Sequence, residues 1–246
     1  FTATPGGTRI LPTTTVSITS AQPLYAQGTP NQYQLNFDAT GGSGTMSAQT
    51  ITYMTQAAIS TNQFTRTGYQ FAGWNTQANG GGNFLANGAN YTMDTAGATL
   101  YAQWTPNAYT VTYDANGTGS AGSTPNSQHQ YGISSPLTPN GFTRPGYTFN
   151  GWATSSGGGV QYVDGDSVMN LSSVNGGTVT LYAVWTGNTY FVAYNANGAT
   201  GGTMATSTFQ IGVTAPLRVN AFIRPGYTFA GWATTAGGPV VYVDGQ

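Results

Sequence analysis

A nine-residue motif that occurs three times is the strongest constraint on the fold of this chain. It reads Arg-Pro-Gly-Tyr-Thr-Phe-Asn-Gly-Trp at 144–152, recurs at 224–232 with one change, and has a looser copy at 66–74. The final tryptophans of successive copies are 78 and 80 residues apart. A period of this length indicates a tandem array of small modules rather than one large domain.

A second motif, Leu-Tyr-Ala-x-Trp, follows the first two copies at 100–104 and 181–185 but does not follow the third before residue 246. A cognate, Leu-Tyr-Ala-Gln, stands instead at 24–27, with Gly28 in the position of the tryptophan. The sequence therefore predicts an extended N-terminal segment and three repeats, of which the third lacks its closing strand: 1–30, 31–105 (repeat 1), 106–187 (repeat 2) and 188–246 (repeat 3).

The composition excludes several classes of partner. Only 4% of the residues are charged, against roughly 25% in ordinary soluble domains, and the net charge is −1. We expect no nucleic-acid partner, because binding to nucleic acid needs a basic face. We expect no membrane span either, because no apolar run approaches about 18 residues. The absence of cysteine excludes thiol chemistry, and a nearly uncharged surface favours self-association.

Alternating apolar and polar residues predict a mainly β fold, with α+β as the limit. Tyr33–Phe37 has the pattern of a half-buried strand, and the same unit recurs at 109–113 and 190–194. Thr13–Ser20 is also strand-like. No segment has a sustained helical period, so each repeat is expected to contain at most one short helix, such as a single turn at Ser167–Leu171.

Two positions in the repeats exchange aspartate with asparagine beside a glycine or an alanine. One is occupied by Asp38, Asp114 and Asn195, and the other by Asn87, Asp164 and Asp244. Turns accept this exchange because both side chains satisfy local backbone groups, whereas catalysis or tight metal binding would not accept the loss of charge. We therefore interpret both positions, including Asp164-Gly-Asp166, as turns rather than calcium ligands.

Nothing in the chain predicts catalysis, a cofactor or a metal. The single histidine, His129, lies in a polar run without a nucleophile motif and is interpreted as an exposed strand residue. The recurring aromatic residues indicate packing rather than a sugar platform. The arginines before each Gly-Tyr are interpreted as structural, stacked on a neighbouring ring. Three glycosylation sequons begin at Asn90, Asn116 and Asn170.

The two motifs at this spacing resemble the Listeria–Bacteroides repeat, also called the internalin B-repeat family. The resemblance covers 31–105 and 106–187 in full and 188–246 in part. It implies tandem β-grasp-like modules on a prokaryotic cell surface, an extracellular location, a stalk or adhesive role, and no enzymatic activity. The shortened last repeat and the absence of a visible sorting signal depart from the pattern of the family.

The displaced motif leads to a hypothesis of strand donation between copies of the chain. A repeat without its closing strand exposes backbone groups that another chain can pair with. Head-to-tail donation is a heterologous contact that does not close, so it grows a fibre. The predicted donor residues are Val16, Ile18, Leu24 and Tyr25. The predicted acceptor residues are Tyr227, Phe229, Trp232, Val241 and Val243.

Three alternatives remain open at this stage. The 246 residues are a window on a longer repetitive chain, whose next stretch fills the third repeat. The N-terminal segment closes the third repeat of its own chain. In a different class, the repeats form an adhesin stalk whose partners are glycans or the surface of a host or neighbouring cell.

Overall fold

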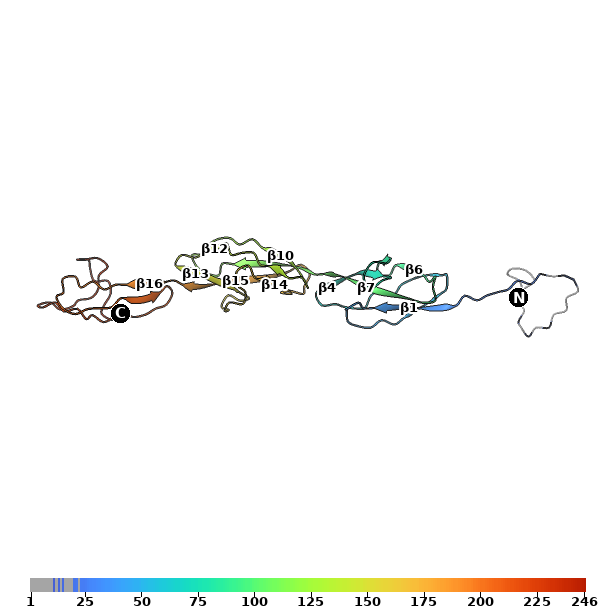
Figure 1. Cartoon of the computed structure of the whole chain (residues 1–246), viewed down its shortest axis with the longest axis horizontal. Helices are drawn as coiled ribbons and strands as arrows, with labels where there is room; N and C mark the ends of the chain where they lie inside the picture. Colours follow the sequence, from blue (N-terminus) through green and yellow to red (C-terminus); the bar gives the residue numbers. More distant parts are fainter. Residues whose placement is uncertain (1–10, 12, 14, 16–19, 22) are drawn as a thin grey trace. The chain divides into compact units, whose positions relative to one another are not determined.

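The computed structural model describes residues 11, 13, 15, 20–21 and 23–246, and it divides into two compact units, 1–107 and 108–246. The predicted donor residues Val16 and Ile18 lie outside the described residues. All regular elements in the described part are strands, which confirms the mainly β fold (Figure 1). The described residues accordingly contain no helix that could span a bilayer.

Repeat 1 is organised around a five-stranded sheet with the order β2-β1-β7-β4-β5. Its strands are β1 (Gln32–Asp38), β2 (Gln49–Thr52), β4 (Tyr69–Asn75), β5 (Phe84–Leu85) and β7 (Ala98–Pro106). A separate ladder joins β3 (Gln56–Ala58) and β6 (Asn90–Thr92). Strand β1 places Leu35 in the core and its polar residues outside, as the alternation predicts.

Repeat 2 has a four-stranded sheet with the order β10-β8-β15-β13. These strands are β8 (Ala108–Asp114), β10 (Ser127–Gln130), β13 (Tyr147–Ala153) and β15 (Gly177–Gly187). Two short ladders complete it, formed by β9 (Ala121–Gly122) with β12 (Phe142–Thr143) and by β11 (Ser135–Pro136) with β14 (Ser167–Val168). The predicted helical turn at Ser167–Leu171 is wrong, because its first two residues pair as β14.

The strand that carries the Leu-Tyr-Ala-x-Trp motif lies in the centre of each complete sheet, not at an edge. In repeat 2, β15 pairs in parallel with β8 on one side and antiparallel with β13 on the other. Strand β7 has the same two neighbours in repeat 1, β1 and β4. The closing strand predicted from the sequence is thus a central strand, and without it a repeat is divided into two parts.

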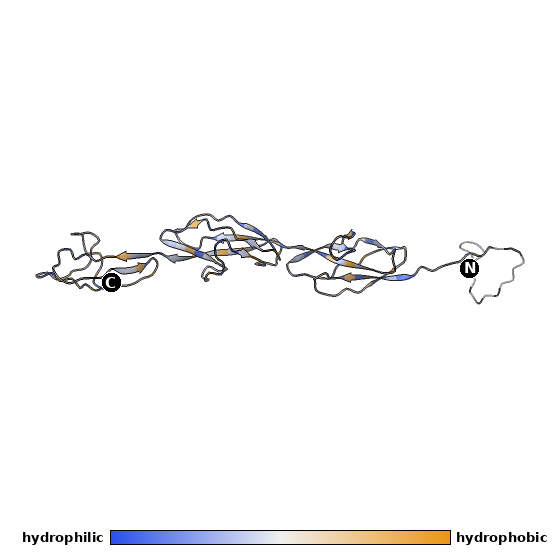
Figure 2. Ribbon diagram, viewed as in Figure 1, coloured by the Kyte–Doolittle hydropathy of each residue, from blue (hydrophilic) through white to orange (hydrophobic). Residues whose placement is uncertain are grey.

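Repeat 3 shows this division. Its only ladder among the described residues joins β16 (Thr189–Val192) to β17 (Ser207–Gln210). Residues 227–232 are not a strand here, although the same motif forms β4 and β13. The physical reason is that a strand needs a partner for its backbone groups, and the central partner is missing. In Figure 2 the strands of all three repeats carry both hydrophilic and hydrophobic segments.

The glycine of the Gly-Trp motif is required by a β-bulge. Gly151 lies at the register shift between β13 and β15, with φ of 140°. A Cβ at Gly151 would lie 2.5 Å from the carbonyl oxygen of Tyr162, so a larger residue would clash with the next segment. Gly231 has φ of 137° and a similar close neighbour, the Tyr242 carbonyl oxygen at 2.7 Å. Repeat 3 therefore holds the bulge geometry even without a central strand.

Candidate strand-acceptor site

Each repeat assembles the same aromatic cluster around the tryptophan of its Gly-Trp motif. The motif phenylalanine lies 5.0, 4.9 and 4.8 Å from the tryptophan ring, for Phe71–Trp74, Phe149–Trp152 and Phe229–Trp232. A ring from the first strand of the repeat lies at a similar distance, 4.8 Å for Tyr113–Trp152 and 4.9 Å for Tyr194–Trp232. Repeat 3 therefore has the rings of a core in place.

The clusters differ in what covers them. Trp74 and Trp152 are fully buried, beneath central-strand residues that are themselves fully buried: Leu100, Ala102, Leu181 and Ala183. Trp232 is only partly buried, and its motif neighbours Tyr227 and Phe229 are 68% and 39% exposed. The exposed aromatic surface of repeat 3 is thus the surface that a central strand covers in the other repeats.

We call the two walls of this uncovered region the acceptor site: β16 extended to Tyr194 on one side and residues 227–233 on the other. No described strand pairs with residues 227–233, or with β16 on the side away from β17. Sequence reasoning identified Tyr227, Phe229 and Trp232 in one wall. It missed Val192 and Tyr194 in the other wall, although their counterparts in repeat 2, Val111 and Tyr113, pair with β15.

The two predicted acceptor valines lie outside the two walls. The Val241 N–H donates to the Trp232 carbonyl at 2.8 Å, and Trp232 also forms a bridge with Tyr242. This segment corresponds to β5 of repeat 1, which pairs with β4 on the side away from β7. Val241 therefore borders residues 227–233 on their far side, and Val243, which bonds Gln246, follows it in the same segment. They stabilise a wall of the site rather than line its interior.

The tryptophan of the second motif anchors the central strand to the turn after the first strand. The Trp185 Nε1–H donates to the Ala115 carbonyl at 2.7 Å, and the Trp104 Nε1–H donates to the Ala39 carbonyl at 2.9 Å. The same indole packs edge-on against the motif phenylalanine, with 5.5 Å between the rings of Phe149 and Trp185. Gly28, at this position of the N-terminal cognate, can make neither contact.

Both Asp/Asn positions lie at turns, but the expected bond to local backbone is confirmed only at the first position. At the first position the side-chain oxygen of Asp38, Asp114 or Asn195 accepts from the backbone N–H two residues later, at 2.7 or 2.8 Å. At the second, the Asp164 Oδ1 accepts from the Asn140 N–H at 2.8 Å, 24 residues earlier in the sequence, so this side chain joins two segments while the turn is closed by the backbone. An oxygen acceptor is all that either position uses, and among the described residues no cluster of three potential metal ligands occurs.

Comparison with known proteins gives the family. The family model of the Listeria-Bacteroides repeat domain matches three segments of the chain, 33–103, 109–184 and 190–246. The chain belongs to the Listeria-Bacteroides repeat domain family. The third match ends with the sequence, in the same repeat in which the structure lacks a central strand.

Three curated relatives are similar to this chain over part of their much longer chains. A Gly-rich membrane protein of Evansella cellulosilytica is 30% identical over 85% of this chain, and a second membrane protein of the same organism is 28% identical over 90%. Internalin H of Listeria monocytogenes is 35% identical over 50% of this chain. The matches span only 23%, 32% and 20% of these relatives.

The arginines of the three Listeria-Bacteroides repeats stack on the motif tyrosine, as predicted. The guanidinium carbons of Arg66, Arg144 and Arg224 lie 4.0, 3.7 and 3.9 Å from the ring centroids of the tyrosines three residues later. This geometry is that of a cation–π contact, which is typically worth about 0.5–1 kcal/mol at exposed sites. The arginines therefore stabilise the turn before the motif strand.

The prediction that His129 is exposed is wrong. His129 is 2% exposed in β10, stacked on Tyr109 with 5.5 Å between the rings, and its Nε2 lies 2.8 Å from the Ser127 Oγ. Burial lowers the pKa of His129, which favours the neutral imidazole. The corresponding positions in the other Listeria-Bacteroides repeats hold Ile51 and Phe209, so this is a core position of the repeat.

The three sequons differ in accessibility. Asn90 and Asn170 are exposed. The Asn116 Nδ2, by contrast, donates to the carbonyls of Ser156 and Ala183, both at 2.9 Å. A glycan on Asn116 would disrupt these two bonds, so Asn90 and Asn170 are the sequons that the fold leaves available.

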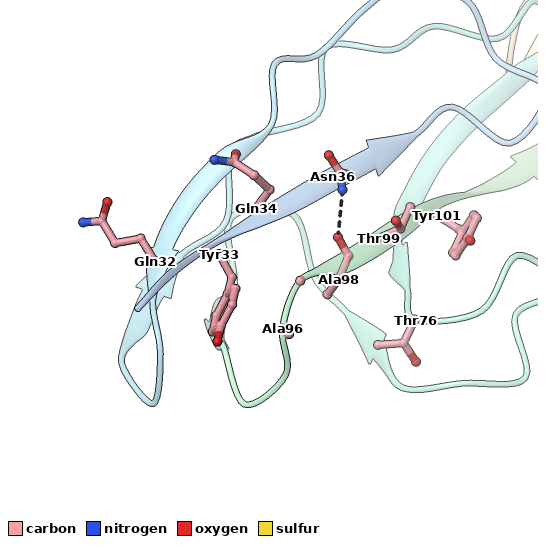
Figure 3. A pocket seen from close by; sticks show the side chains of 10 residues that line it. Gln32, Tyr33, Gln34, Asn36, Thr76, Ala96, Ala98, Thr99 and Tyr101 are labelled. Atoms are coloured by element: carbon pink, nitrogen blue, oxygen red, sulfur yellow. Dashed lines mark hydrogen bonds between the residues drawn. The ribbon is translucent and has the colours of Figure 1, made fainter. Parts of the chain in front are cut away.

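A polar hollow lies on the outer face of the repeat 1 sheet (Figure 3). Ten residues line it, and none is charged: Gln32, Tyr33, Gln34, Asn36, Thr76, Ala96, Gly97, Ala98, Thr99 and Tyr101. Figure 3 shows the Asn36 amide directed at the Ala98 carbonyl, which it bonds at 3.5 Å. A surface of amide and hydroxyl groups beside tyrosine rings suits an uncharged polar ligand.

Proposed function

We propose that the chain is a structural subunit of a filament on the cell surface. In this proposal the N-terminal segment of one copy supplies the central strand that repeat 3 of the next copy lacks. The observation that carries the proposal is the acceptor site, in which a pre-assembled aromatic cluster lies uncovered between two walls without a strand between them. The role is structural rather than enzymatic.

The register of the donated strand follows from the alignment of the second motif. Leu24 aligns with Leu181, which lies opposite Tyr113 in the parallel pair, and Ala26 aligns with Ala183, which lies opposite Trp152 in the antiparallel pair. Leu24 would therefore lie opposite Tyr194, and Ala26 opposite Trp232. The side chains of Leu24 and Ala26 then face the aromatic cluster, as those of Leu181 and Ala183 do in repeat 2.

Donor and acceptor are both open to such a contact. Leu24 and Tyr25 are exposed, and so are Tyr227 and Phe229. Burying one large apolar side chain contributes about 1.5–3 kcal/mol, and the strand would add backbone hydrogen bonds on two sides. Because donor and acceptor are different surfaces, the contact is heterologous and produces an open-ended filament.

A cell-surface location is supported by the relatives. Two of them are named as membrane proteins, and the third is an internalin. The matched region is a minor part of each of these proteins, so activities of their other parts do not transfer to this chain. What transfers is a repetitive β-structure held at the surface.

The proposal is tested by removing the donor. The purified chain should form filaments visible by electron microscopy, with subunits of about 25 kDa, the mass of one chain, in full denaturant. Leu24→Asp and deletion of residues 1–28 should leave repeats 1 and 2 folded but abolish the filaments. Val174→Asp, which places the same charge on an exposed apolar residue of repeat 2, is the matched control and should polymerise normally.

Two results would contradict strand donation. Filaments that persist in the deletion variant would show that the N-terminal segment is not the donor. Native-source material that stays several-fold larger than one chain in denaturant would favour a longer polypeptide, whose own next stretch fills repeat 3.

The polar hollow of repeat 1 supports a second candidate function, recognition of an uncharged glycan. Tyr101→Ala removes a ring that lines the hollow. Repeat 2 provides a natural contrast, because the positions of Asn36 and Thr99 hold Thr112 and Thr180, whose hydroxyl groups bond each other at 3.0 Å. Binding of the whole chain to a neutral-glycan array, lost in Tyr101→Ala, would support this candidate. Absence of binding by the unaltered chain would reject it.

A further inference from the structure

Repeats 2 and 3 belong to one compact unit and are joined by a closely packed contact around Asn188. The Asn188 N–H donates to the Gly146 carbonyl at 2.8 Å, and the Asn188 carbonyl accepts from the Ile211 N–H at 3.0 Å. The Gln210 Nε2 donates to the Gly187 carbonyl at 2.9 Å. We call this set of contacts the repeat joint.

Side chains are tightly packed at the repeat joint. A Cβ at Gly146 would lie 2.4 Å from the Ile211 Cδ1, so Ile211 covers this glycine directly. The Tyr147 hydroxyl would lie 2.9 Å from a Cβ at Gly212. The Thr148 Oγ1 donates to the Asn188 Oδ1 at 2.6 Å. The joint therefore fixes the start of the repeat 2 motif strand, β13, against Asn188, which precedes β16, and against Ile211 and Gly212, which follow β17.

Half of the same joint is present at the start of repeat 1. The Asn31 carbonyl accepts from the Tyr53 N–H at 2.8 Å, as the Asn188 carbonyl accepts from Ile211. Met54, which corresponds to Gly212, has φ of 57°, in the left-handed region that Gly212 occupies with φ of 81°. The backbone that would receive a preceding repeat is thus already shaped, while Tyr53 is 40% exposed.

The other half is present near the start of the repeat 3 motif. Gly226 corresponds to Gly146 and has nearly the same φ, 80° against 77°. A Cβ at Gly226 would have no neighbour within 4 Å, whereas one at Gly146 would collide with Ile211. No described residue bonds the Gly226 carbonyl or the Asn31 N–H. The two incomplete halves are complementary.

We infer that the contact between subunits reproduces the repeat joint. The Asn31 N–H donates to the carbonyl of the partner's Gly226, and Tyr53 covers that glycine as Ile211 covers Gly146. This inference rests on the proposed strand donation, because residues 24–31 lead into β1 as residues 181–188 lead into β16. It adds a second surface, outside the acceptor site, and makes each subunit boundary equivalent to a boundary between repeats.

One substitution at the boundary is compatible with the joint. Pro30 takes the place of Gly187, but Pro106 holds the same position at the end of β7. The next residue there, Asn107, still donates its N–H to the Gly68 carbonyl at 2.8 Å. A proline before the asparagine therefore leaves the defining hydrogen bond intact.

A cysteine pair tests the inference, because the chain has no cysteine of its own. Tyr53→Cys with Gly226→Cys should form disulfides between subunits in oxidised filaments, seen as a ladder of covalent multimers in denaturing electrophoresis. Gly146→Cys with Ile211→Cys is the matched control. It places the same pair in the observed joint, with the same left-handed backbone at one cysteine, and should close within a single chain.

The outcomes separate this inference from strand donation. Filaments without a ladder, with the control pair closed, would overturn the joint and leave donation intact. A ladder that is lost when Leu24→Asp is added supports both, whereas absence of filaments from the unaltered chain rejects donation itself. Hydrogen exchange of the unaltered chain gives a second measurement: the Asn31 amide should be protected at least tenfold more in filaments than in subunits, and equal exchange would overturn the joint.

Discussion

Repeats 2 and 3 contain nearly the same motif strand, the same aromatic cluster and the same turns, and they differ in one strand. In repeat 2, β15 joins β8 to β13 and Trp152 is fully buried. In repeat 3 no strand joins the two corresponding walls, and the motif residues 227–232 do not form a strand. The sequence of the motif is therefore sufficient for the local geometry of the bulge and the rings but not for the sheet.

This difference teaches that the sheet of a repeat is completed by the Leu-Tyr-Ala-x-Trp motif and not by the nine-residue motif that ends in Gly-Trp. The Arg-Pro-Gly-Tyr-Thr-Phe-x-Gly-Trp segment arranges its own rings through local turns and packing. The backbone hydrogen bonds and the burial of Trp152 come from a strand about 30 residues later in the sequence. The proposed strand donation uses this division of the repeat, because the central strand comes from a separate part of the sequence.

The largest effect on stability is expected from removing the tryptophan of the Gly-Trp motif. Trp152→Ala should destabilise repeat 2 by about 3–5 kcal/mol, the usual cost of deleting a fully buried aromatic side chain. Trp232→Ala should cost much less in unassembled subunits, because that ring is only partly buried. Hydrogen exchange resolved by repeat measures both. Equal costs in unassembled subunits would contradict the contrast between the two repeats.

Restoring the missing indole should strengthen the contact between subunits. Gly28→Trp can add a hydrogen bond to the Ala196 carbonyl and an edge contact with Phe229, as Trp185 does in repeat 2. One net hydrogen bond and one aromatic pair together contribute about 1–2 kcal/mol, so the critical concentration for filament growth should fall roughly tenfold. Gly28→Leu, which has no N–H donor, is the control. An unchanged critical concentration in the tryptophan variant would argue against the proposed register.

A smaller effect is expected from pH, and only in repeat 2. Because the pKa of His129 is lower in the folded state than in the unfolded chain, its contribution to stability is present above about pH 6.5 and is lost as the pH falls below that value. Denaturant unfolding between pH 7 and pH 5 should show the loss, before the aspartates titrate. His129→Phe, which copies Phe209 of repeat 3, should remove this dependence. If the free energy of unfolding of His129→Phe still depends on pH in this range, another group titrates.

The smallest effect is expected at the second turn position. Asp164→Asn should change the stability of repeat 2 by less than about 0.5 kcal/mol, because the amide oxygen can still accept from the Asn140 N–H, as Asn87 accepts from Asn62 in repeat 1. Asp164→Ala should cost about 1 kcal/mol through loss of that bond. Thermal unfolding of the two variants compares them. A large effect of the asparagine variant would indicate that the charge itself has a role.

The sequence predicted the elements that depend on local pattern. The alternation around Leu35 and the turn at Asp114 follow from neighbouring residues and were recovered. The position of the Leu-Tyr-Ala strand was not, because an alternating pattern does not state which strands flank it. The structure supplies this information: β15 has 11 residues, and both of its edges are paired.

His129 was misplaced for a different reason. Its neighbours Gln128 and Gln130 are polar, so the local window indicated exposure, yet alternation puts His129 itself on the inner face. Aligning the repeats would have identified the position, because Ile51 and Phe209 are apolar there. Val241 and Val243 were misplaced in the opposite way. Their apolar composition is typical of a core strand, but their segment borders residues 227–233 on the side away from the acceptor site.

The parallel pairing of β8 with β15 also determines how a repeat carries mechanical load. The chain enters repeat 2 through β8 and leaves it through β15, and these two strands are adjacent over six residue pairs. Tension applied through the ends of the repeat pulls the two strands past each other along their length. The hydrogen bonds between them are then loaded together rather than opened one at a time. A strand donated to repeat 3 would occupy the same place, so a non-covalent subunit boundary would resist traction in the same geometry as the covalent repeat.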